Sequence, residues 1–374
     1  MRLKPGDSKR RVDDQAIAAI EGLCSRGEFA QAAAACDRLL IDSLRPQVEA
    51  QVRVLAGQAL ALASRPAPAL EHLNRAKEIL SSHPHTMLAA ECADWEACCL
   101  YLLEDSRAAS VAERALGWCR SLSEPAPLLE ARILEHLGSI HVRNHDYDRA
   151  IAYYERALAA AGDVRDLRRL ARINHGLGAA YDGRGERDSA VVFIRKALVL
   201  YRQEGDLASL ARIENELGLL LMRGGQLQRA EELFVSSLHR FESSGTEIGR
   251  SHVLLSLGEL YLTADRVAEA IPIIRDAIER TGRLNERLAE STGHHLLGEA
   301  MERLGDPAAA DDEYRMALDL LRSDGMDARL IEVHIAYASV LERRSDLAAA
   351  LGQLKQAAGI ALSRSSPRVN PAVR

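Results

Sequence analysis

The fold is decided by the segment Ala131-Arg-Ile-Leu-Glu-His-Leu-Gly138, which returns 40 residues later as Ala171-Arg-Ile-Asn-His-Gly-Leu-Gly178. It returns again as Ala211-Arg-Ile-Glu-Asn-Glu-Leu-Gly218, and Ser251-His-Val-Leu-Leu-Ser-Leu-Gly258 keeps the same pattern. A small residue closes each unit with a period of 40, at Gly138, Gly178, Gly218, Gly258, Gly298 and Ala338. We call these positions the small column. A fixed period of this length is typical of a repeat array.

Three further positions keep step with the small column. An alanine follows 12 residues later, at Ala150, Ala190, Ala230, Ala270, Ala310 and Ala350. A large apolar residue follows after 16, at Tyr154, Ile194, Phe234, Ile274, Tyr314 and Leu354. Another small residue follows after 19, at Ala157, Ala197, Ser237, Ala277, Ala317 and Ala357. Small residues let two helices approach closely and large ones fill the space between them, so each unit is predicted to be an antiparallel helix hairpin.

One hairpin cannot bury its own apolar face, so neighbouring hairpins must stack. The composition agrees with helices: hydrophobic residues make up 47% of the chain, aromatic residues only 4%, and alanine and leucine dominate. The ends of hairpins are predicted at Gly205, Gly245, Asn285 and Gly325, because glycine and asparagine tolerate the left-handed conformation that ends a helix. The prediction is an all-α, right-handed superhelical solenoid.

The column set resembles the tetratricopeptide repeat, with Tyr181 and Tyr261 in its aromatic column, although the usual tryptophan and closing proline are absent. The unit is also longer than the standard repeat. Repeats of 40 residues resemble those of bacterial Rap-type regulators, animal spindle-orientation adaptors and the sensor domains of large bacterial transcription activators. The resemblance implies an inner groove, lined by the first helix of each hairpin, that binds a protein or peptide.

The N-terminal third follows the pattern less closely. Three hairpins are predicted there, with Ile20, Gly57 and Glu96 in the small column. This gives nine hairpins, or 18 helices, over residues 13–362. Residues 1–12 and 363–374 are predicted to be disordered, mildly basic tails.

No phosphate-binding loop, zinc-protease motif or nucleophile elbow is present, so we expect no cofactor and no enzymatic activity. His141 and His145 are spaced so that they could share a helix face and hold a metal, but a polar turn is the favoured interpretation. The same holds for His83 and His85.

Candidate binding residues lie on the first helices. Arg132, Arg172 and Arg212 stand six residues before the small column and are predicted to form a ladder along the groove. Further positions predicted on the same face are Glu135, His175, Asn215, Ser139, Asp182 and Met222. Acidic residues, among them Glu259 and Glu299, follow toward the C-terminus. The groove would then be positive in the middle and negative beyond it.

The three arginines of the ladder also allow an interpretation without a ligand. The arginines can pair with glutamates of neighbouring helices and merely keep the groove soluble, since Arg132 has Glu135 one turn away and Arg212 has Glu216. Exposed pairs of this kind contribute only about 0–1 kcal/mol. A ligand that carries a carboxylate would favour the ladder, because a guanidinium binds carboxylates bidentately.

The sequence predicts a partner that is a protein or peptide. The net charge of −6 argues against nucleic acid, and no apolar stretch is long enough for a membrane span. The N-terminus lacks the apolar core of a secretory signal and all six cysteines favour a reduced state, so a cytoplasmic location is expected. The function predicted is an adaptor, or alternatively a peptide-responsive regulator in bacterial signalling or transcription control. The apolar last helix, Asp346 to Leu362, is a candidate homodimer contact.

Overall fold

The computed structural model describes residues 5–41, 44–82, 86–162, 166–244, 247, 249–322 and 326–365. These residues form 18 helices and no strand, which confirms the all-α prediction and the number of helices. The chain divides into two compact units, residues 1–204 and 205–374, and each is described by itself.

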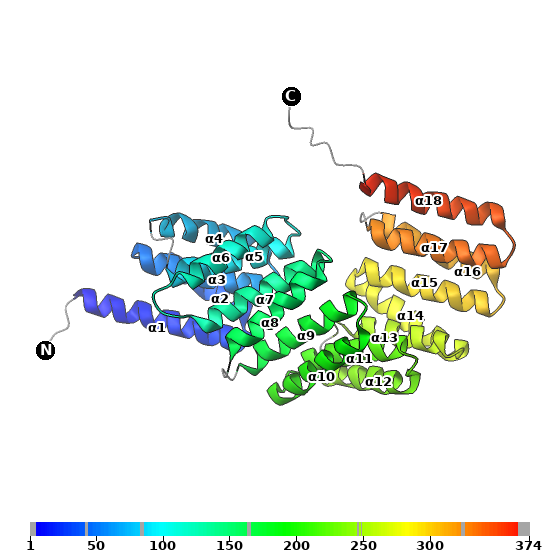
Figure 1. Ribbon diagram of the computed structural model, residues 1–374, viewed down its shortest axis with the longest axis horizontal. Helices are drawn as coiled ribbons and strands as arrows, with labels where there is room; N and C mark the ends of the chain where they lie inside the picture. Colours follow the sequence, from blue (N-terminus) through cyan, green and yellow to red (C-terminus); the bar gives the residue numbers. More distant parts are fainter. Residues whose placement is uncertain are drawn as a thin grey trace, which may run out of the picture. The chain divides into compact units, whose positions relative to one another are not determined.

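Each unit consists of consecutive antiparallel helix pairs (Figure 1). The first unit contains α1 (Pro5–Ser25), α2 (Phe29–Leu40), α3 (Pro46–Leu62), α4 (Pro66–Leu80), α5 (Met87–Leu102), α6 (Ala108–Arg120), α7 (Pro127–Arg143), α8 (Tyr147–Ala161), α9 (Leu167–Gly183) and α10 (Arg187–Glu204). The second contains α11 (Leu207–Arg223), α12 (Leu227–Ser244), α13 (Arg250–Thr263), α14 (Val267–Leu284), α15 (Arg287–Arg303), α16 (Pro307–Arg322), α17 (Asp327–Arg343) and α18 (Leu347–Ser365). Each odd-numbered helix packs on the even-numbered helix that follows it, as the predicted hairpins require.

Helix starts follow from local capping chemistry. The carboxylates of Asp146, Asp166 and Asp206 accept hydrogen bonds from backbone N–H groups in the first turns of α8, α9 and α11. Proline stands at the start of α3, α4 and α7, where its missing N–H has no helical partner to lose. Gly205 and Asn285 adopt the left-handed conformation predicted for them, while Gly245 and Gly325 lie outside the described residues.

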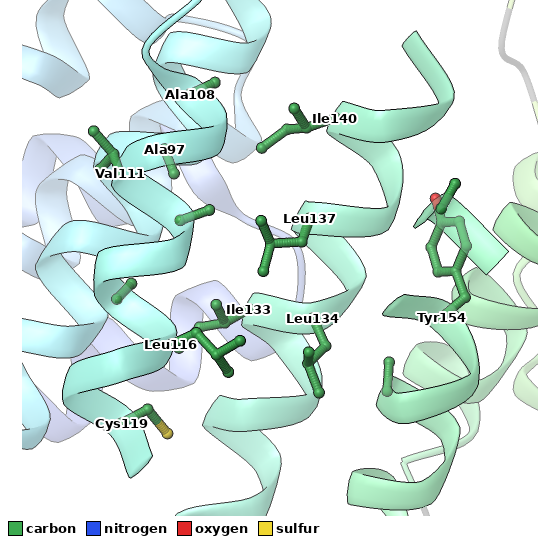
Figure 2. Packing of buried hydrophobic residues seen from close by; sticks show 14 of the residues in the cluster. Ala97, Ala108, Val111, Leu116, Cys119, Ile133, Leu134, Leu137, Ile140 and Tyr154 are labelled. Atoms are coloured by element: carbon green, nitrogen blue, oxygen red, sulfur yellow. The ribbon is translucent and has the colours of Figure 1, made fainter. Parts of the chain in front are cut away.

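The glycines of the small column allow the two helices of a hairpin to approach each other closely. A Cβ atom on Gly138 would lie 2.7 Å from the ring of Tyr154, and one on Gly178 would lie 2.5 Å from Ile194 Cδ1. The large residue of the second helix therefore occupies the space that a side chain on the first helix would need. Figure 2 shows this core around α7, with Ile133 and Leu137 facing the preceding hairpin and Tyr154 on α8.

The third hairpin corrects the predicted register. In the other hairpins a left-handed residue follows the small column by seven positions, as at His145 after Gly138 and Gly185 after Gly178. In the third hairpin the left-handed residue is Glu104, which puts the fully buried Ala97 in the small column. Glu96, which the sequence pattern placed there, stands one residue earlier. The cause is a turn that is one residue shorter before the buried Ala108 of α6.

Helical backbone extends into both segments predicted to be tails. It begins at Pro5 in α1 and ends at Ser365 in α18. The remainder of the two predicted tails, residues 1–4 and 366–374, lies outside the described residues.

Candidate functional site

The first helices of successive hairpins contact one another in both units. These contacts join α3 to α5, α5 to α7 and α7 to α9 in the first unit, and α11 to α13 and α13 to α15 in the second. The first helices α3 to α9 therefore form a continuous layer in the first unit, and α11, α13 and α15 form one in the second. The candidate binding residues stand on these helices, on what we call the inner face.

A buried charge cluster lies at the inner face of the first unit. Asp94 on α5 is fully buried, and its two oxygens lie 2.6 Å from Arg132 Nε and 2.7 Å from His136 Nδ1, both on α7. The guanidinium of Arg132 also lies 5.0 Å above the ring of Trp95. Burial alone would raise the pKa of Asp94, but the charges of His136 and Arg132 and their hydrogen bonds outweigh it and lower the pKa to about 2.

A second cluster surrounds Glu135, one hairpin further along. Its side chain is almost fully buried, and its oxygens lie 2.5 Å from Arg172 Nη2 and 3.2 Å from Arg169 Nη1, both on α9. The Glu135 carboxylate raises the pKa of Arg172, so this guanidinium stays charged. Arg169 is also held by Asp166, at 3.2 Å. The side chain of Arg172 is nevertheless 43% exposed, whereas that of Arg132 is 17% exposed.

Four further side chains belong to this part of the inner face. Ser139 donates a hydrogen bond to the carbonyl of Glu135, 3.1 Å away, and its Oγ lies 3.0 Å from Tyr154 Oη. Burial raises the pKa of the Cys98 thiol to about 12, so it stays protonated and unreactive at neutral pH. His175 and Asp182 on α9 are half-buried, and both interact with neighbouring groups.

In the second unit the predicted residues of α11 fall into different environments. Arg212 is exposed and donates a hydrogen bond to Ser209 Oγ, 2.9 Å away. Asn215 is half-buried, and its Oδ1 is buried without a hydrogen bond to any described residue. Met222 is only 8% exposed and belongs to the core.

The acidic residues on the inner face of the second unit lie near an arginine, Arg329. Burial raises the pKa of Glu259 on α13, and the charge of Glu299 on α15 adds to this effect. Arg329 on α17 lies 2.6 Å from Glu332 and partly offsets these charges. Beside them, burial and then Arg329 lower the pKa of His295 to about 4, which leaves this imidazole neutral at pH 7. The inner face here combines carboxylates with an arginine rather than being purely acidic.

Two tetratricopeptide repeat family models match the chain, one over residues 129–203 and one over residues 215–285. The chain therefore contains tetratricopeptide repeats. A search of curated proteins finds no match.

Several solved structures share this fold along most of their length. The apo form of RapI has a TM-score of 0.74 at 13% identity, covering 95% of this chain and 99% of that one. The apo quorum sensor NprR from B. thuringiensis has a TM-score of 0.73 at 12% identity, with 96% and 99% covered. A Rap protein complexed with competence and sporulation factor has a TM-score of 0.70 at 13% identity, with 94% and 98% covered. The resemblance to Rap-type arrays is thereby confirmed at the level of fold.

The possible metal pair does not share a helix face. His141 lies on α7, is 8% exposed and stacks on Tyr153, whereas His145 occupies the left-handed turn and contacts Tyr147. In the described part of the repeat array, no three histidine, cysteine or acidic side chains converge as metal ligands. His83 and His85 lie outside that part. No described helix is both long and apolar enough to cross a membrane.

Sequence analysis missed the buried acid Asp94 of this tetratricopeptide array. A signal was available, because Asp94 interrupts the apolar run of α5 next to Trp95. With Ala97 in the small column, Asp94 also takes the same position in its hairpin as Glu135 takes in the next. Two acidic residues thus occupy equivalent positions in successive hairpins. Asp94 binds Arg132 and Glu135 binds Arg172, both of which are arginines of the predicted ladder.

Proposed function

We propose that this tetratricopeptide-repeat protein is a non-enzymatic adaptor that binds a protein or peptide segment on the inner face of its first helices. The proposal for the first unit depends on the environment of Arg172. Its guanidinium is anchored by one short contact to Glu135, while 43% of the side chain stays exposed. An anchored and partly exposed arginine is suited to bind a carboxylate bidentately.

The other arginines of the ladder have different roles in this proposal. Arg132 balances the buried Asp94, so it supports the inner face and presents little of its own charge to a ligand. Arg212 is exposed and serves as the corresponding candidate in the second unit. Glu135 contacts Arg172. Further polar contacts to the partner are proposed from Ser139, His175 and Asp182 in the first unit and from Asn215, Glu259 and Glu299 in the second. Met222 contributes packing behind them.

Replacing Arg172 by glutamine is expected to weaken partner binding about 10- to 100-fold, because a hydrogen bond to a charged group contributes about 1.5–3 kcal/mol. The salt dependence of binding should also become shallower. Partners captured from a native lysate are identified first, and their affinities are then measured by calorimetry at two salt concentrations.

Arg195→Gln is the matched control, because Arg195 is an exposed arginine on the second helix α10. It should leave the affinity unchanged. Equal affinities for wild type and the Arg172→Gln variant would contradict the assignment of the inner face. The triple replacement of all three ladder arginines is less informative, because it would leave Asp94 buried without its arginine.

A second candidate function is a peptide-responsive regulator. It is favoured by the likeness to the Rap protein complexed with competence and sporulation factor and to the quorum sensor NprR. In that case a bound peptide would change the curvature of the array and switch the activity of a separate partner. Hydrogen exchange with and without the captured segment distinguishes the two: an adaptor is protected locally, and a sensor changes along many hairpins.

The setting of this function is proposed to be the cytoplasm. The six cysteines are all free, including the buried Cys36, Cys92 and Cys99, as suits a reducing compartment. Leu347, Leu351 and Leu362 of α18 are more than half exposed. Contact of this helix with a second copy of the chain stays a prediction, which sedimentation velocity at high concentration would test.

A further inference from the structure

Glu96 on α5 is a charged residue in a column that is otherwise apolar. The residue before the small column is a buried leucine in five successive hairpins, at Leu137, Leu177, Leu217, Leu257 and Leu297. In the third hairpin this position is Glu96. Three residues earlier the third hairpin has Ala93, where the next hairpin has the fully buried Leu134. Two apolar side chains of the next hairpin's core are thus replaced by a carboxylate and a methyl group.

The Glu96 carboxylate is only partly satisfied. Its Oε1 lies 2.6 Å from Lys77 Nζ on α4, while Oε2 lies 3.5 Å from Arg114 Nη2 on α6. Oε2 is buried and makes no hydrogen bond with any residue that the structure describes. The side chain of Glu96 is 12% exposed, whereas those of Lys77 and Arg114 are about half exposed. A buried oxygen of this kind is suited to accept a hydrogen bond from a ligand.

A cavity of about 100 Å³ lies beside this carboxylate, between α4, α5 and α6. Its lining includes Lys77, Ala89, Cys92, Ala93, Glu96 and Trp118. A dry apolar cavity of about 150 Å³ can hold benzene, whereas pockets for drug-sized ligands measure about 300–1,000 Å³. The cavity therefore has the size of one apolar side chain.

The cavity is separate from the inner face. With 3.6 residues per helical turn, Ala89, Ala93 and Glu96 project from one side of α5. Asp94 and Cys98, which belong to the inner face, project from the opposite side. A ligand in the cavity would consequently not compete with one at Arg172.

We propose that this cavity is a second binding site, which takes one leucine-like side chain of a partner protein segment. The backbone N–H of that residue donates a hydrogen bond to Glu96 Oε2, and the side chain fills the space that leucines occupy in later hairpins. Lys77 and Arg114 carry two positive charges against the single negative charge of Glu96, so they favour a segment with a carboxylate next to the apolar residue. The site does not depend on the proposed function of the inner face.

The test uses the full ¹⁵N-labelled protein and three small probes: N-acetyl-leucine, N-acetyl-leucinamide and N-acetylglycine. The readout is the indole N–H signal of Trp118, distinguished from that of Trp95 with a Trp95→Phe variant. Both leucine probes should shift this signal saturably, with dissociation constants on the order of 1–10 mM for ligands of this size. N-acetyl-leucine should bind several-fold more tightly than the amide, and N-acetylglycine should produce no saturable shift.

Glu96→Leu and Ala93→Leu restore the side chains of the next hairpin and should each fold, because Leu137 and Leu134 occupy the same positions there. Each should weaken binding of N-acetyl-leucine at least tenfold by filling the cavity. Glu71→Leu, at an exposed position of α4, is the control and should bind like wild type. Equal responses to the leucine and glycine probes, or unchanged affinity in both filled variants, would overturn the proposal. Having two filling variants keeps the test decisive if one of them does not fold.

Discussion

Replacing Asp94 by alanine is expected to lower the free energy of unfolding of the first unit by about 3–5 kcal/mol. The variant keeps Arg132 and His136 in place but removes the carboxylate that both of them contact within 2.7 Å. Their side chains are only 17% and 10% exposed, so solvent cannot replace the lost partner. The buried positive charge is then uncompensated, which is the costly outcome when half of a buried pair is removed.

The loss can be measured by urea denaturation followed by circular dichroism, with hydrogen exchange to localise it to α5 and α7. Asp148→Ala is the matched control, because Asp148 pairs with Arg184 while 82% of its side chain is exposed. That variant should lose at most about 1 kcal/mol. A loss of this small size for Asp94→Ala would show that the cluster is not important for stability.

The same carboxylate predicts how stability depends on pH. Its pKa of about 2 lies below the ordinary value of 3.8, so the unfolded chain takes up the proton first as the pH falls. The stabilisation is therefore complete above about pH 4 and is lost as the pH falls through 2. It amounts to about 2 kcal/mol by linkage. Between pH 5 and pH 2, the free energy of unfolding should fall more steeply with pH for wild type than for Asp94→Asn. The same dependence on pH in both proteins would contradict the pKa assignment.

Replacing Tyr314 by alanine is expected to destabilise the second unit by about 3–5 kcal/mol. The side chain is 1% exposed, it packs on Gly298, and its ring stacks on Tyr337 with centroids 4.7 Å apart. Removing it leaves a cavity between α15, α16 and α17. Gly298, which faces that cavity on α15, has no side chain to fill it.

Thermal denaturation and hydrogen exchange would measure this effect. Exchange should accelerate in α15 to α18 while the first unit keeps its protection, because contacts in the array run between helices of the same or adjacent hairpins. Tyr314→Phe keeps the ring and serves as the control, with an expected loss below about 1.5 kcal/mol. Uniform acceleration over both units would contradict local unfolding.

The sequence was sufficient for the architecture because small and large residues alternate with a strict spacing. Gly138, Gly178 and their equivalents can only pack where they do, so the period of 40 predicts the hairpins directly. The third hairpin was predicted one residue out of register, because a turn shortened by one residue leaves Glu96 and Ala97 adjacent and the residue types alone do not separate them. The left-handed backbone conformation at Glu104 identifies Ala97 as the small-column residue.

The candidate site was predictable in part. The period places Arg132 and Arg172 on equivalent helix positions, but it does not show that one is balanced by a fully buried acid and the other is left half exposed. That difference arises from contacts between helices about 40 residues apart, such as Asp94 with Arg132. Met222 was predicted to contact a ligand and lies in the core, where only 8% of it is exposed.

The contacts between adjacent hairpins also bear on how such a gene changes length. A duplication or deletion of 40 codons adds or removes one whole hairpin, and its new neighbours offer the same small and large columns as the old ones. Recombination between repeats would thus lengthen or shorten the inner face by one helix at a time without disturbing the remaining hairpins. The third hairpin, with its shortened turn and its glutamate at a leucine position, is the least interchangeable of the set, and its copy number should be the most strictly kept.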